Sequence, residues 1–456
     1  MEGTSLLSVE PNNSTKNPLA ASNLDGSVAV QGRHGHQYYR DRNGRSAVLQ
    51  RPHTFLANAN SPRINTYRLA AIFFAFINFG MNDGSYGALI PYIEADYGLS
   101  YTVTSFVFLS PFAGYTFAAL FSDHLHRLGG RRGIAILAPL CRIIAYVVIA
   151  THPPYPAVVT ILALAGVGNG LLDAAWNAWI GTLDHTNQLL GLLHGCYGLG
   201  ATISPLIATA MITKGHLGWW KFEYIMIGVV TLEICGGTWA FWKETGLKYR
   251  DDNSTADSDE KGKTRLALKQ RVTWICAAFL LAYVGTEVSL GGWIVTFMIR
   301  IRHGQPFASG MTATGFWLGI TIGRVTLGFI TPKIGERLAV AIYIVCSLGL
   351  ELLFWLVPQF IVSAVAIALV GFFIGPLFPS TVIMATKLLP QELHVAAIGF
   401  AAAVGGGGAA VLPFAVGAIA NARGVQTLQP IVLALLAVLL GIWLLLPRIP
   451  KHLHEN

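Results

Sequence analysis

Long apolar stretches recur along this chain and limit the folds that it can adopt. A stretch of about 20 apolar residues is long enough to cross the hydrocarbon core of a bilayer as a helix. Hydrophobic residues make up 53% of the chain and charged residues 12%, a balance that cannot provide the water-facing surface of ordinary soluble domains. Such stretches lie at 67–94, 101–122, 133–151, 156–182, 188–212, 220–242, 271–299, 310–331, 338–357, 360–387, 394–420 and 427–447. We therefore predict an all-α membrane protein with twelve transmembrane helices.

Lysine and arginine residues are distributed unequally between the two sides of the predicted membrane. If both termini are cytosolic, 24 of the 31 lie in cytosolic segments and five in the outer loops. This is the bias expected from the positive-inside rule, so we predict that both termini are cytosolic. Membrane orientation also explains the net charge of +8, and we expect no nucleic-acid partner.

Composition divides the chain into five parts. Polar and charged segments flank and separate two sets of six predicted spans. A transit peptide is the alternative interpretation of the Arg-containing leader, but the leader lacks a clear amphipathic period. The plasma membrane is favoured, with an internal membrane as the alternative, and we expect a monomer. The predicted parts are a disordered cytosolic tail (1–66), a six-helix bundle (67–242), a cytosolic linker (243–270), a second six-helix bundle (271–447) and a cytosolic tail (448–456).

The two sets of six spans repeat one another in sequence. Asp83 and Gly87 correspond to Glu287 and Gly291 at an offset of 204 residues. Further matches occur at offsets of 205 and 208, namely Gly166 and Gly170 with Gly371 and Gly375, and Gly198, Gly200, Ala201 and Pro205 with Gly406, Gly408, Ala409 and Pro413. Two parallel repeats of six spans are typical of transporters that bind a substrate at the midplane between the halves.

Several motifs resemble those of the major facilitator superfamily. The loop between the second and third spans keeps an acid and a basic cluster, Asp123 with Arg127, Arg131 and Arg132, although Ala119 stands where the family has glycine. Three other stretches are similar to the fucose/proton symporter branch and its glucose/galactose relatives: Asn82-Asp83 with 89–100, Leu193 to Ala201 with Pro205, and Tyr283 to Ser289. The resemblance implies two six-helix halves and a small-molecule substrate.

Asp83 lies near the middle of the first span. A charged acid at this depth is costly, so it is usually shielded in a bundle or a water-filled space. It can bind and release a proton as access switches, or it can be a hydrogen-bonded structural acid. The resemblance implies the first role, because an acid in this span serves the proton cycle of the branch. Asn82 beside it is a candidate substrate ligand.

Asn169, Asp173 and Asn177 share one face of the fourth predicted span, with Trp176 beside them. Amides and carboxylates hydrogen-bond hydroxyl groups and an indole stacks on a sugar ring, so this face suits a sugar. The alternative is a polar seam between helices. The resemblance implies a second important acid in this span, and Asp173 is the only acid there. We therefore assign Asp173 to both proton coupling and substrate binding.

The second half has its own candidates. Tyr283, Glu287 and Gly291 share one face of the seventh span, so Glu287 is a substrate ligand or a second protonatable group. Arg142 is expected to pair with Asp173 or Glu233, because buried opposite charges normally find one another. Pro376 and Pro379 are expected to break the tenth span and free carbonyl groups. A cytosolic charge lock is predicted for Asp123, Arg127, Arg131, Arg132, Arg324 and Arg337.

Together these features predict uptake of a monosaccharide or polyol by alternating access with proton symport. Sodium is the alternative coupling ion. Efflux of hydrophobic compounds and a non-transporting nutrient sensor are the competing functions. We expect neither a metal site nor a cofactor, because the five cysteines lie singly in apolar runs without metal-ligand spacing. Because the sequence has no nucleophile/base constellation, we also predict that the protein is not an enzyme.

Overall fold

The computed structural model describes residues 29–31, 37–40, 46–48, 63–252 and 257–447. The chain forms two compact units, Met1–Asn58 and Ala59–Asn456. In the first unit, three short strands form an antiparallel sheet in the order β1-β2-β3: β1 (Ala29–Gln31), β2 (Gln37–Arg40) and β3 (Ser46–Val48). These strands lie within the predicted disordered tail, for which no strand was expected. The rest of that tail up to residue 62, and the predicted tail 448–456, lie outside the described residues.

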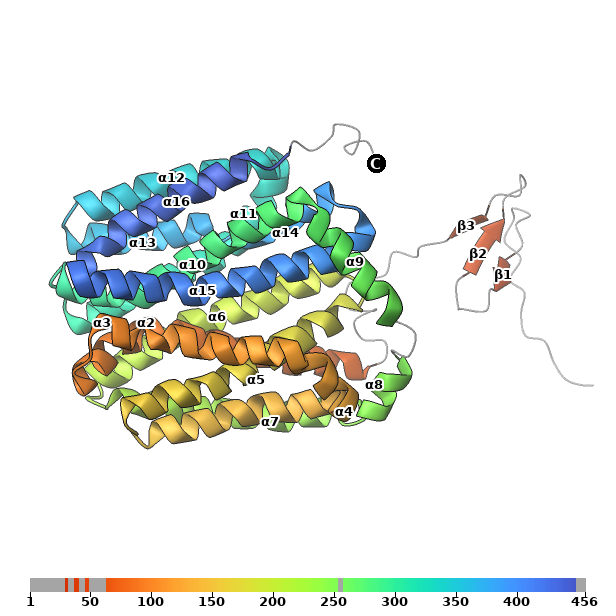
Figure 1. The fold of residues 1–456 in the computed structure, drawn as a ribbon, viewed down its shortest axis with the longest axis horizontal. Coiled ribbons are helices and arrows are strands. Elements are labelled where there is room, and N and C mark those ends of the chain that lie inside the picture. Colours follow the sequence, from red (N-terminus) through yellow and green to blue (C-terminus); the bar gives the residue numbers. More distant parts are fainter. Residues whose placement is uncertain (1–28, 32–36, 41–45, 49–62, 253–256, 448–456) are drawn as a thin grey trace, which may run out of the picture. The chain divides into compact units, whose positions relative to one another are not determined.

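The second unit is helical (Figure 1). Its first half consists of α2 (Ile64–Tyr97), α3 (Tyr101–Thr104), α4 (Phe106–Ala150), α5 (Tyr155–Gly181), α6 (Thr186–Thr213), the short 3-10 helix η1 (Trp219–Lys221) and α7 (Phe222–Ala240). The predicted linker contains α8 (Gly246–Asp252) and α9 (Asp257–Lys269). The second half consists of α10 (Arg271–Arg300), α11 (Pro306–Ile334), α12 (Glu336–Leu356), α13 (Phe360–Ile374), α14 (Leu377–Leu388), η2 (Gln391–Leu393), α15 (His394–Arg423), η3 (Val425–Thr427) and α16 (Leu428–Leu444).

Among the described residues, ten helical stretches are long and apolar enough to cross a membrane. Helix α4, together with α3, forms one of them, although it covers two predicted spans. Its backbone leaves the helical conformation at Gly130, where φ is 66° and ψ is −168°, so the helix bends there. Helix α7 covers the sixth predicted span and is not among the ten. The number of twelve spans therefore stays a prediction.

The internal repeat is confirmed by matched close contacts. A Cβ atom on Gly200 would lie 1.9 Å from the carbonyl oxygen of Ile77, and one on Gly408 would lie 2.0 Å from that of Leu281. Gly408 follows Gly200 by 208 residues, and Leu281 follows Ile77 by 204 residues, so the two contacts correspond in the repeat. Glycine at such positions lets two helix backbones approach closely. Helices α2 and α6 in the first half therefore pack as α10 and α15 do in the second.

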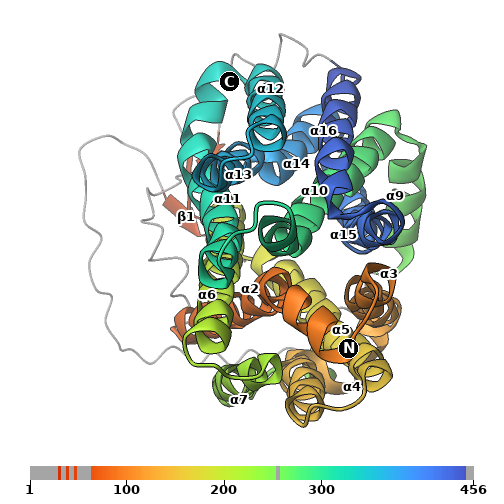
Figure 2. The same ribbon diagram turned by 90° about the vertical axis from the view of Figure 1, so that its left-hand side faces the viewer.

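Viewed along the helices, the halves form two groups, α2 to α7 below and α10 to α16 above (Figure 2). One end of the bundle, where α2 begins, carries Arg68, Arg131 and Lys248 around Glu244, and we call it the basic end. The opposite end, where α2 finishes at Tyr97, we call the far end.

The halves approach each other closely at the far end. A Cβ atom on Gly87 of α2 would lie 1.9 Å from the carbonyl oxygen of Gly291 of α10, the residue to which Gly87 corresponds in the repeat. A salt bridge of 3.3 Å joins Arg300 Nη2 of α10 to Glu94 Oε1 of α2. Because backbone meets backbone there, the halves are closed together at this end.

Candidate functional site

Asp83 is held by neutral hydrogen-bond donors from the first half. The Tyr197 hydroxyl on α6 donates to Asp83 Oδ2 at 2.9 Å, and Asn82 Nδ2 donates to Oδ1 at 2.8 Å. Tyr146 on α4 donates in turn to Asn82 Oδ1 at 3.0 Å. Asn82 and Tyr146 are buried, whereas Asp83 is partly exposed. Three helices thus position one accessible carboxylate.

Asp173 on α5 has a similar environment. The Tyr115 hydroxyl on α4 donates to Asp173 Oδ2, and Asn177 Nδ2 donates to Oδ1 at 2.7 Å. Asp173 and Asn177 thus share one helix face, as expected, and are also joined by a hydrogen bond. Asn169 lies on the same face but is buried, and its Oδ1 atom has no hydrogen-bond partner within the described part of the chain. Among the described residues no hydrogen bond joins Asn169 to Asp173.

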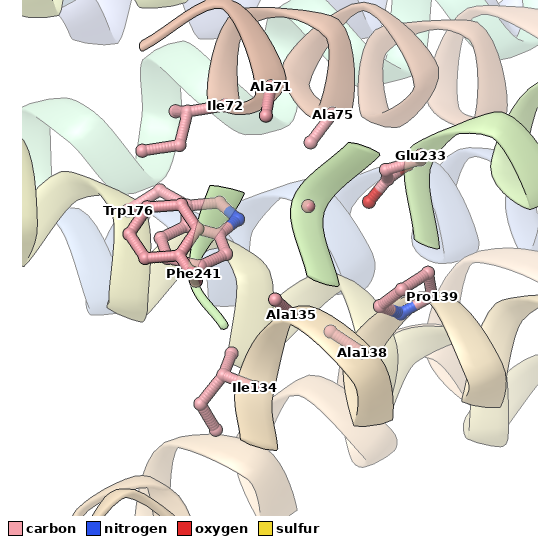
Figure 3. Close-up of a pocket in the computed structure, with 11 residues that line it drawn as sticks. Ala71, Ile72, Ala75, Ile134, Ala135, Ala138, Pro139, Trp176, Glu233 and Phe241 are labelled. Atoms are coloured by element: carbon pink, nitrogen blue, oxygen red, sulfur yellow. The ribbon is translucent and has the colours of Figure 1, made fainter. Parts of the chain in front are cut away.

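Trp176 does not lie beside Asp173 and Asn177. Its indole is 4% exposed and stacks on Phe241, with ring centroids 4.7 Å apart. Both rings line a pocket among α2, α4, α5 and α7, which Glu233 also lines and which does not include Asp83 or Asp173 (Figure 3). At 3.6 residues per turn, the position three residues after Asp173 is rotated by about 60°, enough to turn Trp176 toward α7. The indole therefore does not stand beside Asp173 as a stacking surface for a sugar.

Glu287 in the second half is paired with a cation. Arg324 Nη2 on α11 donates to Glu287 Oε1 at 3.1 Å and lies 3.4 Å from the Tyr283 hydroxyl. Arg324 Nε also donates to the carbonyl oxygen of Gly375 at 3.2 Å. This carbonyl is available because Pro379, four residues farther on, has no N–H group to donate to it, and α13 ends just before Pro376. Arg324 was expected in the cytosolic charge lock, and that expectation is corrected: a buried carboxylate attracts it into the interior.

Tyr197 connects the two halves of the site and was not among the residues selected from the sequence. Its hydroxyl is bonded to Asp83, and it lies within electrostatic reach of Glu287 and Arg324. It belongs to the motif Leu193 to Ala201, but a tyrosine in an apolar span resembles a core residue. Only the fold bonds its hydroxyl to Asp83 and brings it within electrostatic reach of an acid of the second half.

Four acids inside the bundle fall into two classes according to the side chains that bond them. Glu233 and Glu287 are bonded by arginine side chains, which favour the ionised carboxylate. Asp83 and Asp173 are bonded only by tyrosine and asparagine among the described residues. Neutral donors in a poorly solvated place stabilise the ionised carboxylate less than an arginine does. The free energies of the ionised and protonated forms are then closer together, as reversible protonation requires.

Arg142 forms a salt bridge with Glu233, one of the two partners expected for it. Arg142 is fully buried and its Nη2 atom donates to Glu233 Oε1, while Asn78 Nδ2 donates to Oε2 at 2.9 Å. The hydrogen bonds printed for this pair lie within the first half, among α2, α4 and α7. We therefore expect the pair to have a structural role.

Glu233→Gln is expected to destabilise the protein by about 3–5 kcal/mol, because it leaves the buried Arg142 without a counter-charge. Thermal unfolding of the detergent-purified protein measures this change. The double variant Arg142→Met with Glu233→Leu removes both charges and is expected to recover most of the loss. An unchanged unfolding temperature for Glu233→Gln would contradict the structural role.

The other residues of the predicted charge lock are dispersed over the basic end. Asp123 accepts from Arg127 Nε at 2.7 Å in an exposed pair, which contributes little. Arg132 Nη1 lies 3.4 Å from the carbonyl oxygen of Trp242, and Arg337 Nη2 donates to that of Leu444 at 3.0 Å. The first contact lies within α4, the other two join segments of one half, and the three do not form one cluster.

At the basic end, Glu244 forms salt bridges with three basic side chains, and it was not selected from the sequence. Lys248 Nζ, Arg68 Nη2 and Arg131 Nη1 lie 2.6, 2.8 and 3.1 Å from its carboxylate. Burial alone would raise the pKa of Glu244, but the hydrogen bond from Lys248 and the three positive charges outweigh it and hold the pKa below its ordinary value. Glu244 follows α7 in a short charged segment, and nothing in its sequence pattern distinguishes it from its neighbours.

Comparison with known proteins agrees with this architecture. The sequence profile of the Major Facilitator Superfamily matches residues 71–363 and 288–456. The chain is 30% identical over 433 residues to Bypass of stop codon protein 6 of Saccharomyces cerevisiae, covering 88% of this chain and 86% of that protein. It is also 21% identical over 374 residues to a glucose/mannose transporter of Bacillus subtilis, covering 80% and 91% of the two chains.

Among solved structures, the fucose:proton symporter of E. coli shares the fold. The two superpose with a TM-score of 0.57 over 83% of this chain and 98% of that one, at 14% sequence identity. The resemblance expected from the sequence motifs is thus confirmed, as are the multi-pass membrane architecture and the prediction that the protein is not an enzyme. The chain belongs to the major facilitator superfamily, a family of membrane transporters.

Proposed function

We propose that this protein is a secondary active transporter that moves a monosaccharide or polyol by alternating access, together with a proton. The observation that carries the proposal is Asp83, a partly exposed acid with hydrogen bonds only from Tyr197 and Asn82 among the described residues. Such an acid is suited to binding and releasing a proton inside a membrane. Its partner Tyr197 links it electrostatically to the second half, whose movement would change its exposure.

The side chains near Asp83 favour a neutral polyhydroxyl solute. Asp173, Asn177 and Tyr115 in one half, with Glu287 and Tyr283 in the other, offer carboxylate, amide and hydroxyl groups to solute hydroxyls. The cation nearest to this set, Arg324, is already bonded by Glu287, which disfavours an anionic solute. The glucose/mannose transporter among the relatives supports a sugar.

The proposal includes twelve spans with both termini in the cytosol, in a plasma-membrane monomer. The basic end then faces the cytosol, in accordance with the positive-inside rule. The far end faces outward and is closed in this structure by the approach of Gly87 to Gly291. In the cycle, solute and proton bind from outside, the halves rock about the site, and both are released inside.

Uptake by purified protein in liposomes tests the function. Labelled glucose, mannose, fucose and sorbitol are each offered with the outside acidified, and accumulation of one of them above its equilibrium level is expected. A protonophore should abolish that accumulation, and a sodium gradient at equal pH should not replace it. Gradient-independent uptake would contradict proton coupling, and transport restricted to hydrophobic compounds would favour efflux instead.

A further inference from the structure

His194 on α6 lies at the boundary between the two halves. Its imidazole contacts the ring of Phe76 on α2, in its own half, and the ring of Phe378 on α14, in the other half. The ring centroids are 6.1 Å apart in both pairs. His194 is also within electrostatic reach of Arg324 on α11. A polar side chain of the first half is thus surrounded by groups from both halves.

The packing of α6 against α11 supports this placement independently. A Cβ atom on Gly198 of α6 would lie 2.6 Å from Thr321 Oγ1 of α11, and one on Gly310 of α11 would lie 2.2 Å from Thr209 Oγ1 of α6. This face of α6 therefore meets the second half along most of its length. His194 is four residues before Gly198, so it lies on the same face of α6, one turn away.

Both ring nitrogens of His194 are available for hydrogen bonds. The side chain is partly exposed, and neither nitrogen has a hydrogen-bond partner among the described residues. Its polar neighbours are already engaged: Tyr197 bonds Asp83 at 2.9 Å, and Arg324 bonds Glu287 at 3.1 Å. A neutral imidazole has one N–H donor and one acceptor nitrogen. His194 can therefore both donate to and accept from a molecule that enters between the halves.

The surroundings of this imidazole suit a sugar. A sugar ring presents hydroxyl groups and apolar C–H groups side by side, and here an imidazole stands beside the rings of Phe76 and Phe378. Trp176, which was expected to stack on a sugar, is packed on Phe241 instead. The alternative is an aromatic barrier that only fills space between the halves. Such a barrier would not distinguish one solute hydroxyl from another.

We propose that His194 is a solute-binding residue that hydrogen-bonds one sugar hydroxyl, while Phe378 packs on the C–H groups beside it; this inference rests on the proposed sugar transport. Because the two residues belong to different halves, the bound sugar connects the halves at this level. A site that hydrogen-bonds a hydroxyl rejects an analogue lacking it, since the polar group of the site is left unpaired. His194 therefore determines which hydroxyl the sugar must carry.

Binding to the purified protein at equal pH, without a gradient, tests this role. The probe is whichever of glucose, mannose, fucose and sorbitol the wild type binds most tightly, together with its mono-deoxy analogues, and titration calorimetry gives each Kd. Removal of one particular hydroxyl is expected to weaken wild-type binding roughly threefold to tenfold, as loss of one hydrogen bond does.

His194→Phe keeps a ring between Phe76 and Phe378 but cannot form the hydrogen bond. It is expected to bind the parent compound about as weakly as the wild type binds that one analogue, and no longer to distinguish the two. Discrimination at the other hydroxyls should persist. His194→Gln, whose amide has a donor and an acceptor, is expected to retain the discrimination. His194→Leu also removes both nitrogens and replaces His194→Phe if that variant does not fold, as judged by gel filtration.

His126→Phe is the matched control, because it makes the same change on α4, where His126 Nδ1 lies 2.8 Å from the carbonyl oxygen of Ser122. Its affinities are expected to equal those of the wild type. The role of His194 is overturned if His194→Phe binds the parent compound as tightly as the wild type, or if it weakens the parent and every analogue by one factor. A wild type that binds none of the four compounds would overturn the proposed function, and this inference with it.

Discussion

Gly87→Val is expected to abolish net transport by preventing the halves from closing at the far end. A Cβ atom at this position would lie 1.9 Å from the carbonyl oxygen of Gly291, so a side chain cannot fit unless two backbones separate. Overpacking of a well-packed interior typically costs about 1–3 kcal/mol, and here the obstacle is main chain, which cannot rotate away. The cost falls only on the conformation closed at the far end, so the population shifts to the open one.

Spin labels at His216 and Gln426, exposed residues at the far end in the two halves, measure this shift. The distance between the labels is expected to increase in Gly87→Val and in the repeat-related variant Gly291→Val. Gly228→Val is the matched control, because Gly228 lies on α7 with no atom within 4 Å of its added Cβ. If Gly87→Val transports at the wild-type rate with unchanged label distances, the closed far end has no part in the cycle.

Asp83→Asn is expected to eliminate accumulation of the solute while exchange continues. The amide oxygen can still accept the Tyr197 hydrogen bond that the carboxylate accepts at 2.9 Å, although the NH2 group cannot accept the bond from Asn82, and the size of the side chain is kept. An amide cannot take up and release the coupling proton at neutral pH, so solute binding is retained and coupling is lost. Uptake under an acid exterior should fall to the rate without a gradient.

Asp96→Asn provides the control for Asp83→Asn, since it makes the same chemical change on the same helix. Asp96 lies at the outer rim, where its bond to the half-exposed His152 contributes about 1 kcal/mol or less. Accumulation is expected to survive this change. Should Asp83→Asn accumulate solute like the wild type, Asp173, the other acid with neutral donors, becomes the candidate for proton coupling.

Contacts along a single helix were predictable from the sequence. The shared face of Asp173 and Asn177 follows from one helical turn, and the break before Pro376 follows from the N–H groups that Pro376 and Pro379 lack. The helical period also limits what a sequence can say. Trp176 is three residues from Asp173, and the rotation of about 60° was enough to place it on Phe241. Residues at the margin of a helix face predicted from the sequence can therefore pack against a different neighbouring helix.

The sequence by itself determined the membrane architecture, the family and the two-fold repeat, because hydropathy, charge bias and glycine spacing are properties of a single chain. It also singled out Asp83, Asp173 and Glu287 as candidate site acids. Only the tertiary structure decided which of them are paired: Arg324 bonds Glu287, whereas Tyr197 bonds Asp83. The partners lie 37 and 114 residues apart, and which helix faces which is decided by the packing of small residues in three dimensions. Charge and hydrogen-bond partnership follow from that packing.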